Sequence, residues 1–315
     1  MQRILDPAQI EAFGERSVPR IRLPDPASLF VRRARRLRAL AEGHSLEDYL
    51  RLMAALADGQ QVALDALRAA LVSEEFAQQL GRQIELAHEH RMPLLQAAGW
   101  PRQERWRAIL NALCASLAAA PGFPAGVQSV CERITASPSA EIEAQADLLV
   151  AARTSGVDAQ AAPFVMAALQ VYWTAMASSL QINDVTPIDV PGVCPTCGTL
   201  PVSSIVRSDK RSQGYRYLHC GLCATEWHMV RITCSQCLAN DGITYQSIEG
   251  GTTAVRAESC SKCHTYRKIL YQEKDPEVEP VADDLASLAL DLLMTEEGLH
   301  RGSGNPLLWQ NPDLD

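Results

Sequence analysis

The chain has 315 residues, of which 47% are hydrophobic and 5% aromatic, and its formal net charge at pH 7 is −8. This length permits more than one domain and a sizeable core. The acidic balance argues against a protein that binds nucleic acid with its whole surface, because such proteins are normally basic.

The first part of the chain, residues 1–188, is rich in alanine and leucine, which is a helical composition. Its N-terminal segment, Met1 to Pro26, carries scattered charges and lacks the apolar core of a signal peptide, so we expect a cytoplasmic protein. The rest predicts an all-helical domain. Helical segments are indicated after Ser28, after Ser45 and across Gln61 to Leu71, Gly81 to Gly99 and Arg102 to Ala119.

One apolar stretch raises the question of membrane insertion. Ala161 to Leu180 contains no charged side chain and is about as long as a bilayer is thick. Its polar residues, its many alanines and the absence of basic flanks disfavour insertion. We therefore predict a buried central helix and no membrane span.

Eight of the ten cysteines occur as four Cys-x-x-Cys pairs. The unit Cys-x2-Cys-x22-Cys-x2-Cys occurs twice, because Cys194 and Cys234, like Cys220 and Cys260, are 40 positions apart. Two residues between cysteines let a tight turn aim both sulfurs at one ion, and two facing turns complete a tetrahedral site. The predicted metal ligands are Cys194, Cys197, Cys220 and Cys223 in the first unit and Cys234, Cys237, Cys260 and Cys263 in the second.

Three other arrangements of these cysteines compete with two metal sites. Disulfides are disfavoured because cytoplasmic thiols stay reduced. A catalytic redox pair opens a helix beside a β-α-β unit, and none of the four pairs has that helical setting. A cross-braced site would join the first pair to the third, but the equal x22 intervals favour sequential pairing. The remaining cysteines, Cys114 and Cys131, have no close partner in the sequence and are interpreted as small buried hydrophobic residues.

The segments around the paired cysteines predict β-hairpins. The β-prone runs are Val202 to Arg207, Tyr215 to Leu218 and Glu226 to Ile232 in the first unit, and Ile243 to Ile248, Thr253 to Ala257 and Tyr266 to Tyr271 in the second. Each unit therefore resembles a zinc ribbon or a rubredoxin-like module, and four thiolates accept iron or zinc in the same geometry. Because each site already has four sulfurs, His219, His228 and His264 are interpreted as rim or hydrogen-bonding side chains rather than ligands.

Basic residues are concentrated in two places. The helix after Ser28 carries Arg32, Arg33, Arg35, Arg36 and Arg38, which we interpret as a solvated helix face because no aromatic residues are interleaved. The two cysteine units also contain more basic than acidic residues, so a nucleic-acid-binding ribbon is kept as an alternative function. These residues are Arg207, Lys210, Arg211, Arg216, Arg231, Arg256, Lys262, Arg267, Lys268 and Lys274.

The C-terminal part of the chain predicts one more helix. Acidic residues at its start, Asp283 and Asp284 among them, suit the positive end of a helix dipole. Leu285, Leu288, Ala289, Leu292 and Leu293 would share its apolar face.

Several segments resemble the formate dehydrogenase accessory proteins of the FdhE family. The resemblance extends over nearly the whole chain, and the combination is much more specific than paired Cys-x-x-Cys alone. It lies in Cys194-Pro195-Thr196-Cys197-Gly198, Arg216 to Cys220, Glu226-Trp227-His228, Ala257 to Cys260 and Asp275 to Leu293, together with Leu29-Phe30, Arg32 to Leu40 and Asp48-Tyr49-Leu50 near the N-terminus.

The resemblance implies a cytoplasmic accessory protein that is needed for active respiratory formate dehydrogenase and that binds the catalytic subunit before export. It also implies rubredoxin-like iron binding by the eight paired cysteines. No nucleophile–base pair, phosphate-binding glycine loop or Rossmann fingerprint is present in the sequence, so we expect no catalysis. An electron-transfer or redox-sensing function, with iron cycling between Fe(II) and Fe(III), is the first alternative.

The expected fold is α+β and multidomain. Residues 1–188 would form a helical N-terminal domain, and residues 189–232 and 233–275 would form two tandem rubredoxin-like or zinc-ribbon modules. Residues 276–315 would form a C-terminal helix and tail. The expected partner is the catalytic subunit of formate dehydrogenase, with no nucleic acid and no membrane insertion.

Overall fold

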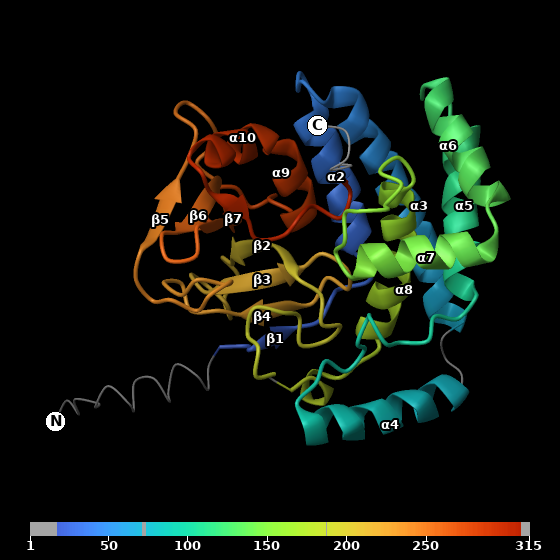
Figure 1. Ribbon diagram of the computed structural model, residues 1–315, viewed down its shortest axis with the longest axis horizontal. Coiled ribbons are helices and arrows are strands. Elements are labelled where there is room, and N and C mark those ends of the chain that lie inside the picture. The colour runs from blue at the N-terminus through green and yellow to red at the C-terminus, as the bar shows by residue number, and fades with distance from the viewer. Residues whose placement is uncertain (1–17, 71–73, 187, 310–315) are drawn as a thin grey trace.

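The computed structural model describes residues 18–70, 74–186 and 188–309 (Figure 1). Helices make up the N-terminal part of the chain. A strand-rich region with two four-cysteine clusters follows, and two further helices lie over it. The predicted fold class is therefore confirmed. Residues 1–17 and 310–315, which belong to the first and last predicted segments, lie outside the described residues.

The helical region is built around one long helix and one buried helix. A single helix, α3, replaces the two segments predicted after Ser45 and across Gln61 to Leu71. Gly59 lies within this helix. A Cβ there would come within 2.9 Å of Leu113 Cδ2, so glycine permits the close approach of α5. The helices of this region are α2 (Leu29–Ala41), α3 (Glu47–Ala70), α4 (Glu74–His90), α5 (Arg105–Ala119), α6 (Ala125–Ala136), α7 (Ser139–Val150) and α8 (Ala162–Ala177), followed by the 3-10 turn η1 (Ile182–Asp184).

The segment predicted as a helix over Gly81 to Gly99 is helical only at its start. Helix α4 ends at His90, and Arg91 then takes a left-handed backbone conformation with φ 48°. Pro93 is incompatible with a continuing helix, so residues 91–99 form a loop instead. Leu94 and Leu95 of this loop are buried.

Helix α8 is the centre of the helical region. Every one of its residues is buried, which confirms the prediction of a buried central helix, but the helix ends at Ala177 and Ser179 of the predicted stretch is exposed. Among the described residues, no helix combines the length and the apolar character that crossing a bilayer would require. Cys114 and Cys131 are also buried, as predicted.

The two cysteine units share one sheet. Its spatial order is β1-β4-β3-β2-β7-β6-β5, and β8 pairs with β7. Strands β2 and β7 join the units in parallel, with Ser204 opposite Ile269. The residues before α2 add β1 to the edge beside β4. The strands are β1 (Ile21–Arg22), β2 (Pro201–Val206), β3 (Arg216–Cys220), β4 (Glu226–His228), β5 (Ile243–Gln246), β6 (Val255–Cys260), β7 (Thr265–Tyr271) and β8 (His300–Arg301).

The single C-terminal helix of the prediction is two helices, α9 (Pro280–Ala286) and α10 (Leu288–Glu296). They meet at Ser287, whose φ of −111° and ψ of 36° interrupt the helix. The predicted apolar face was therefore wrong beyond this break. Leu292 is 68% exposed, whereas Leu290 and Met294 are buried.

The predicted solvated face of α2 was also wrong in part. Arg35 and Arg38 are exposed, but Arg33 is buried and pairs with Glu279 at 3.0 Å. Arg36 pairs with Asp283 at 2.6 Å. Both acidic partners lie at the start of α9, so the sequence around α2 alone gave no sign of them.

Candidate metal centres

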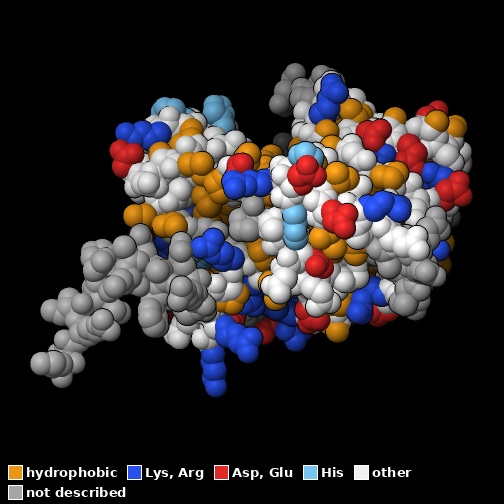
Figure 2. Space-filling view, turned by 90° about the horizontal axis from the view of Figure 1, so that it is seen from below, with side chains coloured by type: hydrophobic (Ala, Val, Ile, Leu, Met, Phe, Trp, Pro, Cys, Tyr) orange, Lys and Arg blue, Asp and Glu red, His pale blue; other side chains and the backbone are white. Residues whose placement is uncertain are grey.

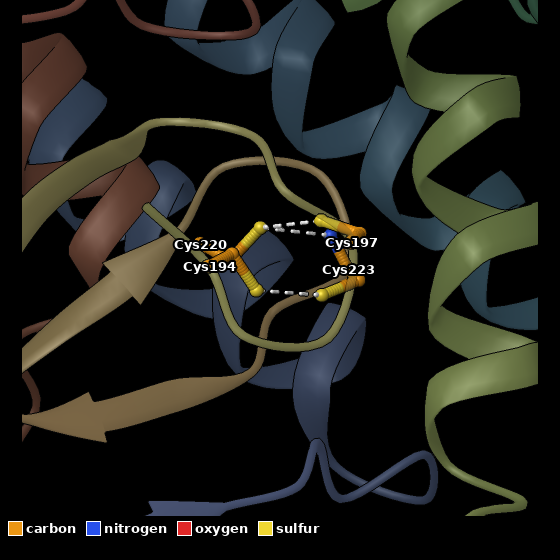
Figure 3. A group of neighbouring side chains, drawn as sticks. All are labelled: Cys194, Cys197, Cys220 and Cys223. Atoms are coloured by element: carbon orange, nitrogen blue, oxygen red, sulfur yellow. Dashed lines mark hydrogen bonds between the residues drawn. The ribbon is translucent and has the colours of Figure 1, made fainter. Parts of the chain in front are cut away.

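The eight paired cysteines form two clusters. The first cluster contains Cys194, Cys197, Cys220 and Cys223, and the second contains Cys234, Cys237, Cys260 and Cys263. Within each cluster all four Sγ atoms lie within 4.8 Å of one another. Sequential pairing is the arrangement found, and all ten cysteines, which lie in the described part of the chain, are free of disulfides. Figure 3 shows the side chains of the first cluster pointing toward a common centre.

The sulfur spacing matches a tetrahedral site. Four metal–sulfur bonds of about 2.3 Å in tetrahedral geometry place the sulfurs about 3.8 Å apart. The observed Sγ–Sγ distances are close to that value, so each cluster fits one Zn²⁺ or iron ion. They are 3.6 Å for Cys194–Cys223, 3.4 Å for Cys197–Cys220, 3.7 Å for Cys234–Cys263 and 3.7 Å for Cys237–Cys260.

All four Cys-x-x-Cys turns share one backbone shape. The residue after each second cysteine is left-handed, with φ values of 78° at Gly198, 58° at Ala224, 64° at Leu238 and 54° at His264. In three of the turns that residue's N–H donates to the carbonyl of the first cysteine. Left-handed backbone costs a non-glycine residue about 1–2 kcal/mol. The turns thus hold a strained shape that aims both sulfurs the same way.

Backbone N–H groups also point at the sulfurs. Leu222 and Cys223 each donate to Cys220 Sγ at 3.3 Å, and Gln236 donates to Cys234 Sγ at 3.4 Å. The bond from Cys223 is visible in Figure 3. Such donors favour the thiolate, which is the form that binds a metal.

Three threonines beside the sulfurs were missed in the sequence. Thr199 Oγ1 lies 3.2 Å from Sγ of both Cys197 and Cys220. Thr225 Oγ1 lies 3.3 Å from Cys223 Sγ, and Thr265 Oγ1 lies 2.9 Å from Cys263 Sγ. The sequence feature that indicates them is a Cys-x-x-Cys-x-Thr pattern, which occurs in three of the four turns. The third turn has Ala239 in the equivalent place.

The thiols of the first cluster cannot all ionise without a cation. Burial raises the pKa of Cys194 well above its ordinary value, and hydrogen bonds to the neighbouring thiols raise it further. Burial acts the same way on Cys220, but hydrogen bonds from Cys194, Cys197 and Cys223 outweigh it and hold the pKa of Cys220 well below its ordinary value. One thiolate is therefore favoured at the expense of the others, and four thiolates require a bound metal ion.

The second cluster is less buried than the first. All four cysteines of the first cluster are buried, and they belong to the same hydrophobic core as α8. In the second cluster Cys263 is half-buried and Cys237 is exposed. Burial acts to raise the pKa of Cys263, but the Thr265 hydroxyl and N–H outweigh it and lower that pKa to about 7.

The histidines of the cysteine units lie outside both clusters. His219 is buried, and its Nδ1 lies 3.0 Å from Glu226 Oε1. His228 packs edge-to-face against Tyr215 and Tyr217. His264 is exposed in the fourth turn. Among the described residues, the two groups that could hold a metal contain cysteines alone.

Three basic residues of the cysteine units are buried and therefore not available to a nucleic acid. Arg216 is buried and pairs with Glu258 at 2.6 Å. Lys268 is buried and pairs with Asp291 at 2.6 Å, and buried Arg267 donates to Ser235 Oγ. On the face in Figure 2, acidic and basic side chains are interspersed. The local excess of basic residues is therefore only partly buried, because Lys210, Arg211, Arg231, Lys262 and Lys274 are exposed.

Comparison with known proteins assigns nearly the whole described chain to one family. Residues 18–189 match the family described as FdhE, N-terminal. Residues 193–231 match the FdhE central domain, and residues 232–308 match the FdhE C-terminal domain.

Individual relatives agree with this assignment. The chain is 42% identical over 311 residues to a protein FdhE homolog of Cronobacter sakazakii, covering 98% of this chain and 97% of that protein. It is also 42% identical over 293 residues to Protein FdhE of Salmonella paratyphi A, covering 93% and 92%. The crystal structure of the FdhE protein from Pseudomonas aeruginosa matches with a TM-score of 0.81 and 37% identity, covering 92% of this chain and 99% of that one. The chain therefore belongs to the FdhE family.

Proposed function

We propose that this protein is a cytoplasmic accessory factor required for active respiratory formate dehydrogenase, that it binds the enzyme's catalytic subunit, and that it catalyses no reaction of its own. The observation that carries this proposal is membership of the FdhE family along nearly the entire described chain. The resemblance noted in the sequence links that family to formate dehydrogenase.

We propose the eight paired cysteines as ligands of two metal ions, iron or zinc. The near-tetrahedral sulfur spacing, the four matching turns and the N–H and hydroxyl groups beside the sulfurs support this assignment. Bound iron would supply a one-electron couple, whereas bound zinc would supply a redox-inert structural charge. The protein's own residues set the spacing of the thiolates and stabilise their charge.

A deletion strain tests the accessory function. Formate-dependent dye reduction should be lost when the gene is deleted and should return when the full-length chain is supplied on a plasmid. The affinity-tagged chain should retain the catalytic subunit from the restored strain. Normal formate dehydrogenase activity in the deletion strain would refute the proposal.

Electron transfer or redox sensing is the second candidate function. The partial exposure of Cys237 and Cys263 favours it, because electrons pass more readily to a site near the surface than to one in the core. Anaerobically purified protein would then contain iron, with a visible absorption that bleaches on reduction. Zinc alone in protein prepared without added metal would exclude this candidate.

A further inference from the structure

We infer that the two clusters have different roles: the second cluster exchanges its metal with dissolved thiol or chelating ligands, whereas the first keeps its metal as part of the folded core. This inference rests on the metal binding proposed above. It goes beyond that proposal because the two units have the same cysteine spacing, which gives no reason to expect different roles.

The first cluster is covered on both of its turns by other parts of the chain. The loop after α4 covers the first turn: Leu95 N–H donates to Thr196 O at 2.7 Å, and Ala97 N–H donates to Cys197 O at 2.9 Å. Helix α8 covers the second turn, where Gln170 Nε2 donates to Gly221 O at 2.7 Å. A ligand from solution can reach these sulfurs only if the loop or the helix moves away.

Packing against the first turn is also tight. A Cβ on Gly198 would lie 3.2 Å from Pro93 Cγ, which is a tight approach, whereas one on Gly221 would make ordinary contact with Val202 at 3.6 Å and Pro306 at 3.7 Å. Trp173 of α8 holds the covering loop through a 3.1 Å bond from its indole Nε1 to Leu95 O. Opening the first cluster therefore disrupts the main core.

The second cluster is covered at one point of the third turn, where buried Ser235 packs against Gly192 and accepts a hydrogen bond from Arg267 Nε at 2.9 Å. Its two turns present exposed side chains on both sides: Gln236, Cys237 and Leu238 in one turn, and Ser261, Lys262 and His264 in the other. The fourth turn is held by two backbone bonds, from His300 N–H to His264 O at 2.8 Å and from Ser261 N–H to Gly242 O at 2.9 Å.

A groove of about 580 Å³ lies next to the fourth turn. Ser261 and His264, which flank Cys263, form part of its wall, and Met294 and Leu299 contribute an apolar side. This volume is large enough for a small organic thiol or chelator. A dissolved ligand can thus come close to the second cluster without any movement of the helical region.

Cys237 is the sulfur that is released most easily. It is exposed, and its turn carries Ala239 where the other three turns carry a threonine hydroxyl beside a sulfur. In an exchange step, a donor atom of the incoming ligand binds the ion while the Cys237 sulfur leaves it and takes up a proton from water. No electron is transferred, so the step needs no oxidant or reductant.

The test is the rate of zinc release from the full-length chain. Protein loaded with two equivalents of Zn²⁺ is mixed with excess 4-(2-pyridylazo)resorcinol, and the coloured zinc complex is followed with time. We expect two phases of one equivalent each, with rates that differ at least tenfold. A single phase that releases both equivalents would overturn the inference.

Two variants show which cluster releases its zinc in the fast phase. Cys237→Ser should leave only the slow equivalent, and Ala239→Thr, which restores the hydroxyl of the other turns, should slow the fast phase and leave the slow one unchanged. A fast phase that persists in Cys237→Ser would overturn the inference. Circular dichroism checks that each variant is folded. Failure of the wild-type chain to bind zinc at all would instead refute the proposed metal sites, so the two claims are separable.

Discussion

Arg33 and Glu279 form a buried ion pair between the N-terminal helices and the segment that follows the second cluster. Arg33 Nη2 lies 3.0 Å from Glu279 Oε1, and the two side chains are 2% and 4% exposed. The other carboxylate oxygen of Glu279 accepts hydrogen bonds from Val281 and Ala282 N–H at the start of α9. One carboxylate therefore caps a helix and also links two distant parts of the chain.

Replacing Arg33 should be strongly destabilising. Arg33→Met leaves Glu279 buried without its cation, which costs about 3–5 kcal/mol in the free energy of unfolding. Arg35→Met is the matched control, because Arg35 and its partner Glu277 are 64% and 56% exposed, and such a pair contributes about 1 kcal/mol or less. Urea denaturation measures both. An equal loss of unfolding free energy in the two variants would show that the buried Arg33–Glu279 pair contributes no more to stability than an exposed one.

Acid should weaken the fold through Asp284. Burial alone would raise its pKa, but Arg301 and Lys268 outweigh burial and hold the pKa of Asp284 below its ordinary value of 3.8. Because the unfolded chain binds this proton more tightly, the stabilisation is present above pH 3.8 and is lost as pH falls below it. The unfolding free energy of Asp284→Asn should therefore fall less steeply with acidification than that of the wild type. Parallel curves from pH 6 to 3 would contradict this assignment.

The threonine beside the first cluster should contribute to metal affinity. Thr199→Val removes the hydroxyl that lies 3.2 Å from two sulfurs, and loss of such a group weakens metal binding about 10–100-fold. Thr135→Val is the control, since that hydroxyl bonds only to carbonyls of its own helix. Competition for zinc with a chelator of known affinity measures the change. An unaltered zinc affinity in Thr199→Val would show that the Thr199 hydroxyl does not contribute to metal binding.

Gly198 should be harder to replace than another left-handed glycine. Gly250→Ala, at φ 73° with no atom near its added Cβ, should cost about 1–2 kcal/mol for backbone conformation alone. Gly198→Ala has a similar φ of 78° and also presses on Pro93, so its melting temperature should fall further. If both variants melt at the same temperature, the contact between the first turn and the covering loop is unimportant.

The features that the sequence predicted are local or periodic. The 40-residue repeat predicted which cysteines gather, and short β-prone runs predicted the strands from β2 to β7. The missed features depend on partners far along the chain. Nothing near Arg33 indicates Glu279, and nothing in either cysteine unit indicates that β2 would pair with β7. The break at Ser287 involves no proline or glycine; there the serine hydroxyl donates to the carbonyls of Asp283 and Asp284. The domain boundaries at residues 188, 232 and 275 stay a prediction.

Metal stoichiometry tests the central claim most directly. Native mass spectrometry of the chain, purified anaerobically from its own host, should show two metal ions per chain. Cys220→Ser should lose the ion of the first cluster, and Cys260→Ser should lose that of the second. A wild-type chain that carries no metal under these conditions, or variants that keep both ions, would contradict the assignment of the two clusters as metal sites.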